Sequence, residues 1–168
     1  HASNVAIRNN IGLNLAYFVS VDHVNPVSEP TISENVKIYE NTLLLNGLYG
    51  FALGSYNSGV NFNNFSFYNN IIYSNGSASA ENLVIRFSGN DLSQLHSNNN
   101  MIYVPHESAA HKPFYNGNYL NLSQWQTLGK DTNSFISNPQ FLSTDPASPN
   151  FLKLSSTSPA INNGTQVP

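Results

Sequence analysis

Two charged side chains in the sequence could take part in acid–base chemistry, although they are far apart along the chain. Asp22 and Arg86 lie in the strand-like segments 17–24 and 82–90. On neighbouring coils of a repeating fold, they could supply a carboxylate and a base. They could equally be exposed residues or form a surface ion pair, which contributes little to stability. We therefore name Asp22 and Arg86 as candidate catalytic residues, and the catalytic groups are otherwise unknown.

A second set of side chains has the chemistry of a carbohydrate-binding surface. Arg8, Tyr39 and Tyr68 occupy equivalent positions in three repeated segments, and Asn98 follows them in a fourth. Tyrosine combines a flat apolar ring with a polar hydroxyl group. An outward column of these residues would form an amphipathic strip that could bind a sugar ring. The alternative is a stack of side chains across the coils that shields one face of a sheet.

Metal binding has little support in the sequence. His106, Glu107 and His111 lie between Pro105 and Pro113 and lack the spacing of a helical zinc motif, so a polar loop is the better interpretation. A multi-carboxylate calcium site is not expected from only nine Asp and Glu residues. The absence of cysteine excludes disulfide bonds and thiolate zinc sites. We therefore predict no metal site and no cofactor in this chain.

The charge and hydropathy patterns exclude two classes of partner. The formal net charge is −3, and the six Lys and Arg residues are scattered, whereas nucleic-acid binding needs clustered cations. No apolar run approaches the roughly 18 residues of a membrane span. We therefore expect neither nucleic acid nor a membrane as a partner.

The elements that would position these residues are shown by an internal repeat. Each repeat reads polar, apolar, any, apolar, any, Asn or Glu, Asn, although the fourth copy departs at its second apolar position. The closing asparagines follow one another after 31, 29 and 30 residues, and a short apolar strand comes next each time. The four copies are Asn4–Asn10, Asn35–Asn41, Asn64–Asn70 and Gln94–Asn100.

Alternation at period two predicts strands with one buried face, which carries Val5, Ile7 and their equivalents. One coil cannot bury this face alone, but stacked coils bury one another. Asn10, Asn41, Asn70 and Asn100 would then lie above one another as a ladder, in which each side-chain amide donates to one neighbour and accepts from the next. The alternative is four surface turns that happen to contain asparagine.

The pattern changes after Asn100, where we expect the ladder to stop. Residues 123–128 can form a short helix with Asn121 or Ser123 as its cap and Gly129 as its end. We expect Trp125 to be a residue of the hydrophobic core rather than a surface on which a sugar ring stacks. Asp131 and Ser134 have the character of turn and cap residues, and closing strands are expected in the tail.

The C-terminal run resembles the tail of many bacterial right-handed parallel β-helix proteins of the polysaccharide lyase-like (pectate lyase-like) superfamily. The resemblance implies an all-β chain, 1–168, that forms a single right-handed parallel β-helix domain. Four repeated coils (1–105) would be followed by terminal coils and a closing tail (106–168), as a fragment of a longer β-helix. The residues that carry the resemblance are Trp125, Gly129, Asp131, Ser134, Asn138, Pro139, Phe141, Asn150, Phe151, Leu154, Ser158, Pro159, Ala160, Ile161 and Gly164.

The same resemblance implies a protein that is secreted or on the bacterial cell surface and that acts on or binds a polysaccharide or oligosaccharide. Its activity would be lyase-like or glycoside hydrolase-like, with the catalytic coils upstream of this chain. In such lyases the base is a Lys or Arg, and Ca²⁺ in the full-length protein is a further possibility. The alternative is a non-catalytic module that binds carbohydrate or is adhesive or structural. The sequence does not predict the oligomeric state.

Overall fold

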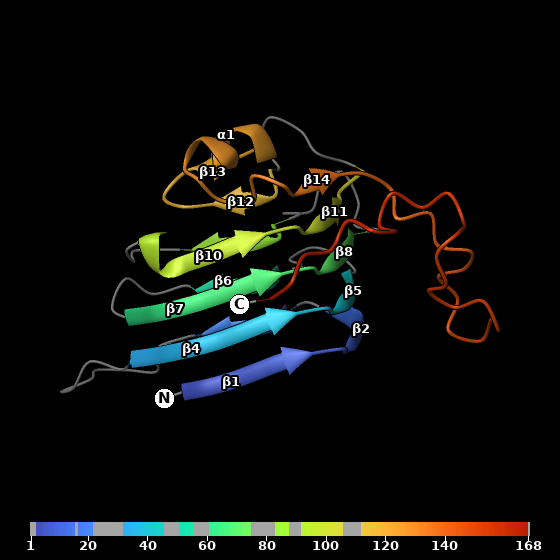
Figure 1. Cartoon of the computed structure of the whole chain (residues 1–168), viewed down its shortest axis with the longest axis horizontal. Coiled ribbons are helices and arrows are strands. Elements are labelled where there is room, and N and C mark those ends of the chain that lie inside the picture. Colours follow the sequence, from blue (N-terminus) through green and yellow to red (C-terminus); the bar gives the residue numbers. More distant parts are fainter. Residues whose placement is uncertain are drawn as a thin grey trace.

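The structure, a computed structural model, describes residues 3–15, 17–21, 32–45, 51–55, 61–74, 83–87, 92–105 and 112–167. In these residues the chain is mostly β, with parallel sheets and a short helix (Figure 1). The prediction of an all-β chain is confirmed at this level. The segments that hold Asp22 and His106 lie outside the described residues.

The described strands form three sheets, which the chain visits in turn over residues 3–115. The first sheet contains β1 (Ser3–Arg8), β4 (Ile32–Tyr39), β7 (Asn61–Tyr68) and β10 (Leu95–Asn98). The second contains β2 (Ile11–Leu15), β5 (Thr42–Leu45), β8 (Ile71–Ser74), β11 (Met101–Tyr103) and β14 (Phe135–Ile136). The third contains β3 (Tyr17–Val21), β6 (Phe51–Ser55), β9 (Ile85–Phe87), β12 (Phe114–Tyr115) and β13 (Tyr119–Leu120).

Each passage of the chain through the three sheets is called a coil here. Every pairing between the described strands is parallel except that of β12 with β13. Equivalent positions of the repeat pair directly, as Val5 does with Val36 and Val36 with Phe65. Figure 1 shows β1, β4, β7 and β10 stacked in this order. The repeat read from the sequence therefore sets the register of the sheets.

The interior is filled by the apolar positions of the repeat. Ile38 and Phe67 are fully buried, as alternation predicts. Val5 and Ile7 are only half-buried, because β1 is an edge strand and no described strand lies beyond it. In the fourth coil Ser97 takes an inward position and is buried as well. The core therefore runs along the stack and thins out at the first coil.

The bends between the first and second sheets explain the paired polar residues of the repeat. Asn9, Glu40, Asn69 and Asn99 have φ angles of 56°, 58°, 55° and 53°. This left-handed region is unfavourable for most side chains, and asparagine tolerates it best among residues other than glycine. Each of them directly precedes one of the ladder asparagines, so the two-residue motif is the bend itself.

A hairpin and a helix cover the end of the stack beyond β10. The helix α1 (Leu122–Thr127) is capped by Asn121, whose side chain accepts from the Gln124 N–H at 2.8 Å while Gln124 Oε1 accepts from the Asn121 N–H at 3.1 Å. Trp125 is fully buried and stacks on Phe114 with ring centroids 5.0 Å apart. Both the predicted helix and the predicted core role of Trp125 are confirmed, although the helix begins and ends one residue earlier than expected.

The tail after β14 lies along the outside of the second sheet. Phe141 contacts Tyr73 of β8, with ring centroids 6.0 Å apart. The last described residues return to the bend at Asn69, whose Nδ2 donates to the Thr165 carbonyl at 2.7 Å (Figure 1, red). The expected closing strands are present as β12, β13 and β14. Beyond Ile136 the described tail contains only isolated bridges, such as Phe141 with Leu154.

Replacing Ile38 by alanine should lower the free energy of unfolding by about 2–5 kcal/mol, because it leaves a cavity in a packed interior. His96→Ala, on the exposed face of the same sheet, should stay within about 0.5 kcal/mol of the parent chain. Urea unfolding measures both. Equal losses in the two variants would contradict the burial pattern of the first sheet.

Candidate functional site

Asn10, Asn41, Asn70 and Asn100, called the asparagine column here, are joined by hydrogen bonds from coil to coil. The Nδ2 of each donates to the Oδ1 of the next, at 3.0 Å in all three steps. The backbone N–H of each donates to the same Oδ1, at 3.0, 3.1 and 3.0 Å. The structure therefore brings these four predicted residues together.

A further hydrogen bond uses the remaining donor hydrogen of the two inner asparagines, Asn41 and Asn70. Nδ2 of Asn41 donates to the Ile7 carbonyl at 3.0 Å, and Nδ2 of Asn70 donates to the Ile38 carbonyl at 3.1 Å. A primary amide offers two donor hydrogens and an oxygen that accepts two bonds. Both capacities are used in Asn41 and Asn70, which are each 1% exposed. Such complete pairing is what a buried polar group needs.

The asparagines stop at Asn100, as expected, but the series of hydrogen bonds continues for one more step. Asn100 Nδ2 donates to Asp131 Oδ1 at 2.9 Å, and the Asn100 N–H donates to Ser134 Oγ at 2.8 Å. Asp131 and Ser134 form a turn, as expected, in which the Ser134 N–H donates to the Asp131 carbonyl at 2.9 Å. Both residues are buried, so their side chains also serve as interior hydrogen-bond acceptors. Asp131 follows Asn100 by 31 residues, the same spacing as that between two column asparagines. That spacing was the available sequence signal.

Asp131 is suited to the last place in the column because an ionised carboxylate only accepts hydrogen bonds. Its Oδ1 accepts from Ser134 Oγ at 2.6 Å, in addition to Asn100. Its Oδ2 accepts from Trp125 Nε1 at 2.9 Å. The buried charge is therefore stabilised by three donors, and the indole ring is fixed in the core by the same group.

The outward positions of the first sheet hold the second predicted set. Arg8 pairs with Tyr39, Tyr39 with Tyr68, and Tyr68 with Asn98. Arg8 is exposed, and the two tyrosines are half-buried. We call Arg8, Tyr39 and Tyr68 the tyrosine strip. Asn98 closes it on one side, because its Oδ1 accepts from the Asn133 N–H at 2.7 Å.

Burial, and to a smaller extent the negative charge of Asp131, raises the pKa of the Tyr68 hydroxyl above its ordinary value. The neutral phenol is therefore the favoured form through the whole neutral range. A neutral hydroxyl both donates and accepts hydrogen bonds. The strip thus presents a cation at Arg8 and an uncharged polar group at Tyr68.

The structure places Arg86 against an aromatic ring. Its guanidinium carbon lies 5.0 Å from the centroid of the Tyr115 ring, in a cation–π contact. Tyr115 in turn meets the edge of Tyr119, with centroids 5.0 Å apart. Asp22, the other catalytic candidate, lies outside the described residues. The structure therefore gives Arg86 an aromatic packing partner and leaves the proposed pair untested.

Within the ranges that the structure describes, no group of three or more His, Cys, Asp or Glu side chains could hold a metal ion. His106, Glu107 and His111 are not part of those ranges. Among the same residues, no helix is long and apolar enough to cross a membrane.

Sequence reasoning missed an aromatic cluster on the outer face of the second sheet. Tyr73 and Tyr103 pair in register, and their ring centroids are 5.1 Å apart. Phe141 of the tail covers Tyr73. Burial, followed by the neighbouring Tyr103, raises the pKa of Tyr73. The repeat alone carries no sign of this cluster, because Phe141 arrives from the irregular tail.

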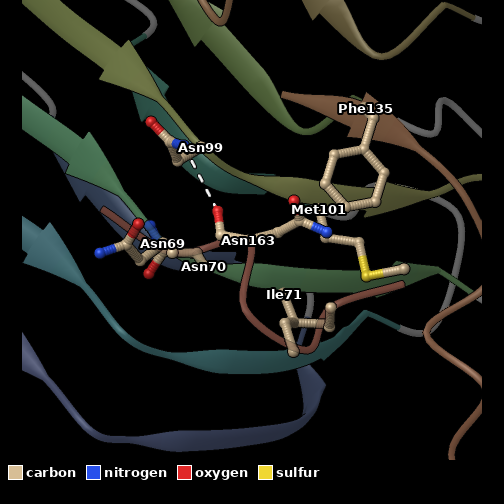
Figure 2. Close-up of a pocket in the computed structure, with 9 residues that line it drawn as sticks. Asn69, Asn70, Ile71, Asn99, Met101, Phe135 and Asn163 are labelled. Atoms are coloured by element: carbon tan, nitrogen blue, oxygen red, sulfur yellow. Dashed lines mark hydrogen bonds between the residues drawn. The ribbon is translucent and has the colours of Figure 1, made fainter. Parts of the chain in front are cut away.

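A small pocket lies between the tail and the bends of the third and fourth coils (Figure 2). Its volume is about 100 Å³, which is room for about three water molecules and too little for a sugar ring. Asn99 Nδ2 donates to the Asn163 carbonyl at 3.3 Å across it. Neither the tyrosine strip nor Arg86 lines this pocket. We therefore regard it as a packing gap under the tail.

Comparison with known proteins gave no match to a family model, to a curated protein or to a solved structure. The likeness of the C-terminal run to the tails of pectate lyase-like proteins therefore stays a prediction. The same holds for secretion, bacterial origin and activity on polysaccharide.

Replacing Asp131 by asparagine should lower the free energy of unfolding by about 1–3 kcal/mol. The new side-chain NH2 group would face at least one of the groups that now donate to Asp131, so that two donors would meet with no acceptor between them. Asp145→Asn is the matched control, since Asp145 is exposed and its Oδ1 only accepts from the Ala147 N–H. Urea unfolding followed by the fluorescence of Trp125 measures both. If Asp131→Asn were as stable as the control, the column would not end on a required acceptor.

Proposed function

We propose that this chain is part of a right-handed parallel β-helix protein that binds polysaccharide. The proposed architecture is a solenoid of coils of about 30 residues, closed by the C-terminal hairpin, helix and tail. The succession of the three sheets in rotation from β1 to β12 supports it. So does the asparagine column, which has the hydrogen bonds of the expected ladder.

The tyrosine strip carries the functional part of the proposal. Its three side chains project from adjacent parallel strands, so they are spaced by about 4.8 Å along the stack. The strip therefore runs across the strands, and each coil contributes one of its side chains. A polysaccharide is also a repeating chain, and it can lie along such a strip with successive rings against successive side chains.

The side chains of the strip match the chemistry of a sugar. A pyranose has apolar C–H faces that pack on the ring of Tyr39 or Tyr68, and its hydroxyl groups bond to the phenol oxygens. Arg8 adds a planar set of donors at the open end of the strip, which suits hydroxyl or carboxylate oxygens. Binding rather than turnover is what these residues support.

Lyase-like or glycoside hydrolase-like catalysis, in this proposal, belongs to coils upstream of the chain. The described coils then contribute binding surface and close the end of the fold. The purely adhesive or structural alternative differs in predicting no sugar binding at the strip. A trimer in light scattering, with no affinity for any polysaccharide, would favour that alternative.

Tyr39→Ala and Tyr68→Ala should each weaken the binding of the chain to polysaccharide by roughly tenfold, which corresponds to about 1.4 kcal/mol. Affinity electrophoresis in gels that contain acidic or neutral polysaccharides measures the change. Tyr119→Ala is the control, because Tyr119 is exposed but belongs to the third sheet. Thermal unfolding of each variant shows whether it is folded.

Unchanged binding in both strip variants would contradict the tyrosine strip as the site. Release of unsaturated sugar products by the chain alone would show that catalysis is not confined to upstream coils. In that case Arg8→Lys and Arg86→Lys would distinguish the first sheet from the third sheet as the catalytic face.

A further inference from the structure

Two asparagines of the bends, Asn69 and Asn99, hold the tail on the stack. Asn69 binds the tail as a neighbouring strand would. Its Nδ2 donates to the Thr165 carbonyl at 2.7 Å, and its Oδ1 accepts from the Thr165 N–H at 2.9 Å. Asn99 Nδ2 donates to the Asn163 carbonyl at 3.3 Å (Figure 2). We call these hydrogen bonds the tail clasp, and the peptide between its two halves is Asn163–Gly164.

An asparagine that precedes a glycine is open to attack by its own main chain. The backbone nitrogen of the glycine can bond to the side-chain Cγ of the asparagine and close a cyclic imide, because glycine has no Cβ that hinders the approach. Two conditions favour this reaction. The glycine N–H must not be held in a hydrogen bond, and water must reach the peptide in order to hydrolyse the ring.

The peptide Asn163–Gly164 meets both conditions. Both residues are exposed and lie outside the described strands and helices. Among the described residues, no group accepts a hydrogen bond from the Gly164 N–H. Both residues also line the pocket of about 100 Å³ under the tail, which has room for water. Asn163 Nδ2, the nitrogen that leaves, donates to the Pro159 carbonyl within the tail, so its loss breaks no bond to the coils.

We propose that Asn163 is a site of spontaneous deamidation and that this modification opens the tail clasp. Gly164 N bonds to Asn163 Cγ while the bond from Cγ to Nδ2 breaks, and the Gly164 amide proton leaves with Nδ2 as ammonia. One water molecule then opens the imide. Attack at the side-chain carbonyl gives aspartate, whereas attack at the main-chain carbonyl gives isoaspartate, in which the chain continues through the former side chain.

Isoaspartate changes the clasp because it lengthens the main chain by one methylene group, about 1.5 Å. The former Asn163 carbonyl becomes part of a carboxylate, whose oxygens can still accept from Asn99 Nδ2. Thr165 moves out of register with Asn69, because a pair of hydrogen bonds to one residue requires fixed distances and angles. The modification therefore releases the half of the clasp at Asn69 and retains the half at Asn99.

An internal comparison is provided by Asn116–Gly117, which is also an Asn–Gly pair within the described ranges. It lies in the hairpin between β12 and β13, which is closed by the pairing of Tyr115 with Tyr119. The Asn116 N–H donates to the Asn118 carbonyl at 3.1 Å. This bonded turn restricts the backbone rotation that ring closure requires, so we expect slower deamidation at Asn116 than at Asn163.

The test is incubation of the full chain in mildly alkaline buffer. Peptide mass spectrometry follows deamidation, and a protein isoaspartyl methyltransferase labels the isoaspartate. The product should accumulate faster at Asn163 than at Asn116. Gly164→Ala should slow the reaction at Asn163 on the order of tenfold. The alanine fits, because its Cβ would lie 3.7 Å from Asn69 Cγ, in ordinary contact. Equal rates at the two asparagines, or an unchanged rate in Gly164→Ala, would overturn the proposal.

Amide hydrogen exchange tests whether the clasp opens. In the modified fraction of an aged sample, the Thr165 amide should exchange roughly tenfold faster than in the fresh chain, because it loses its acceptor. Asn69→Gly removes that acceptor and still permits the left-handed bend, so it gives the exchange rate of an open clasp. Aged Gly164→Ala should keep the rate of the fresh chain. Isoaspartate at Asn163 with unchanged exchange at Thr165 would show that the modification leaves the clasp closed, against the proposal. None of these measurements depends on the binding of polysaccharide.

Discussion

The structure depends on one recurring interaction, the hydrogen bond between the side-chain amide of an asparagine and that of the equivalent asparagine in the next coil. A primary amide can donate two hydrogen bonds and accept two. The Asn41 side chain therefore donates to the next amide and to a carbonyl of the coil before, and it accepts from the amide and the backbone N–H of Asn10. The bend needs a left-handed residue directly before it, and Asn69 and Asn99 meet this need. Apolar packing fills the interior, but the amides fix the register in which it packs.

The same interaction gives the stack a direction. Each amide donates toward the C-terminal end, so the series needs an acceptor there, and Asp131 supplies one that cannot donate further. Its other oxygen holds Trp125, which stacks on Phe114. Termination of the column and closure of the core therefore depend on a single carboxylate. The N-terminal end has no such terminator among the described residues, and Asn10 there turns back on its own coil.

The proposed binding surface and the packed interior lie on different faces of the same strands. Val36 and Ile38 point inward, while Lys37 and Tyr39 alternate with them on the outer face. Outer residues can change with little effect on the interior, because alternate side chains of a strand lie on opposite faces. The tyrosine strip uses this freedom, and the parallel register aligns its members without any contact among them being needed.

The sequence by itself determined the features that repeat or are local. The spacing of the asparagines, the alternation around Ile38 and the cap at Asn121 each depend on residues that are near in sequence or recur at one period. Tertiary structure alone decided the contacts that join the repeat to the irregular tail, such as those of Phe141 with Tyr73 and of Thr165 with Asn69. The last two residues are 96 positions apart in the sequence. It also decided that Arg86 packs on Tyr115. The alternation of apolar and polar residues determines which face of a strand a side chain lies on. Only the folded chain brings a group that is distant in sequence to within bonding distance of it.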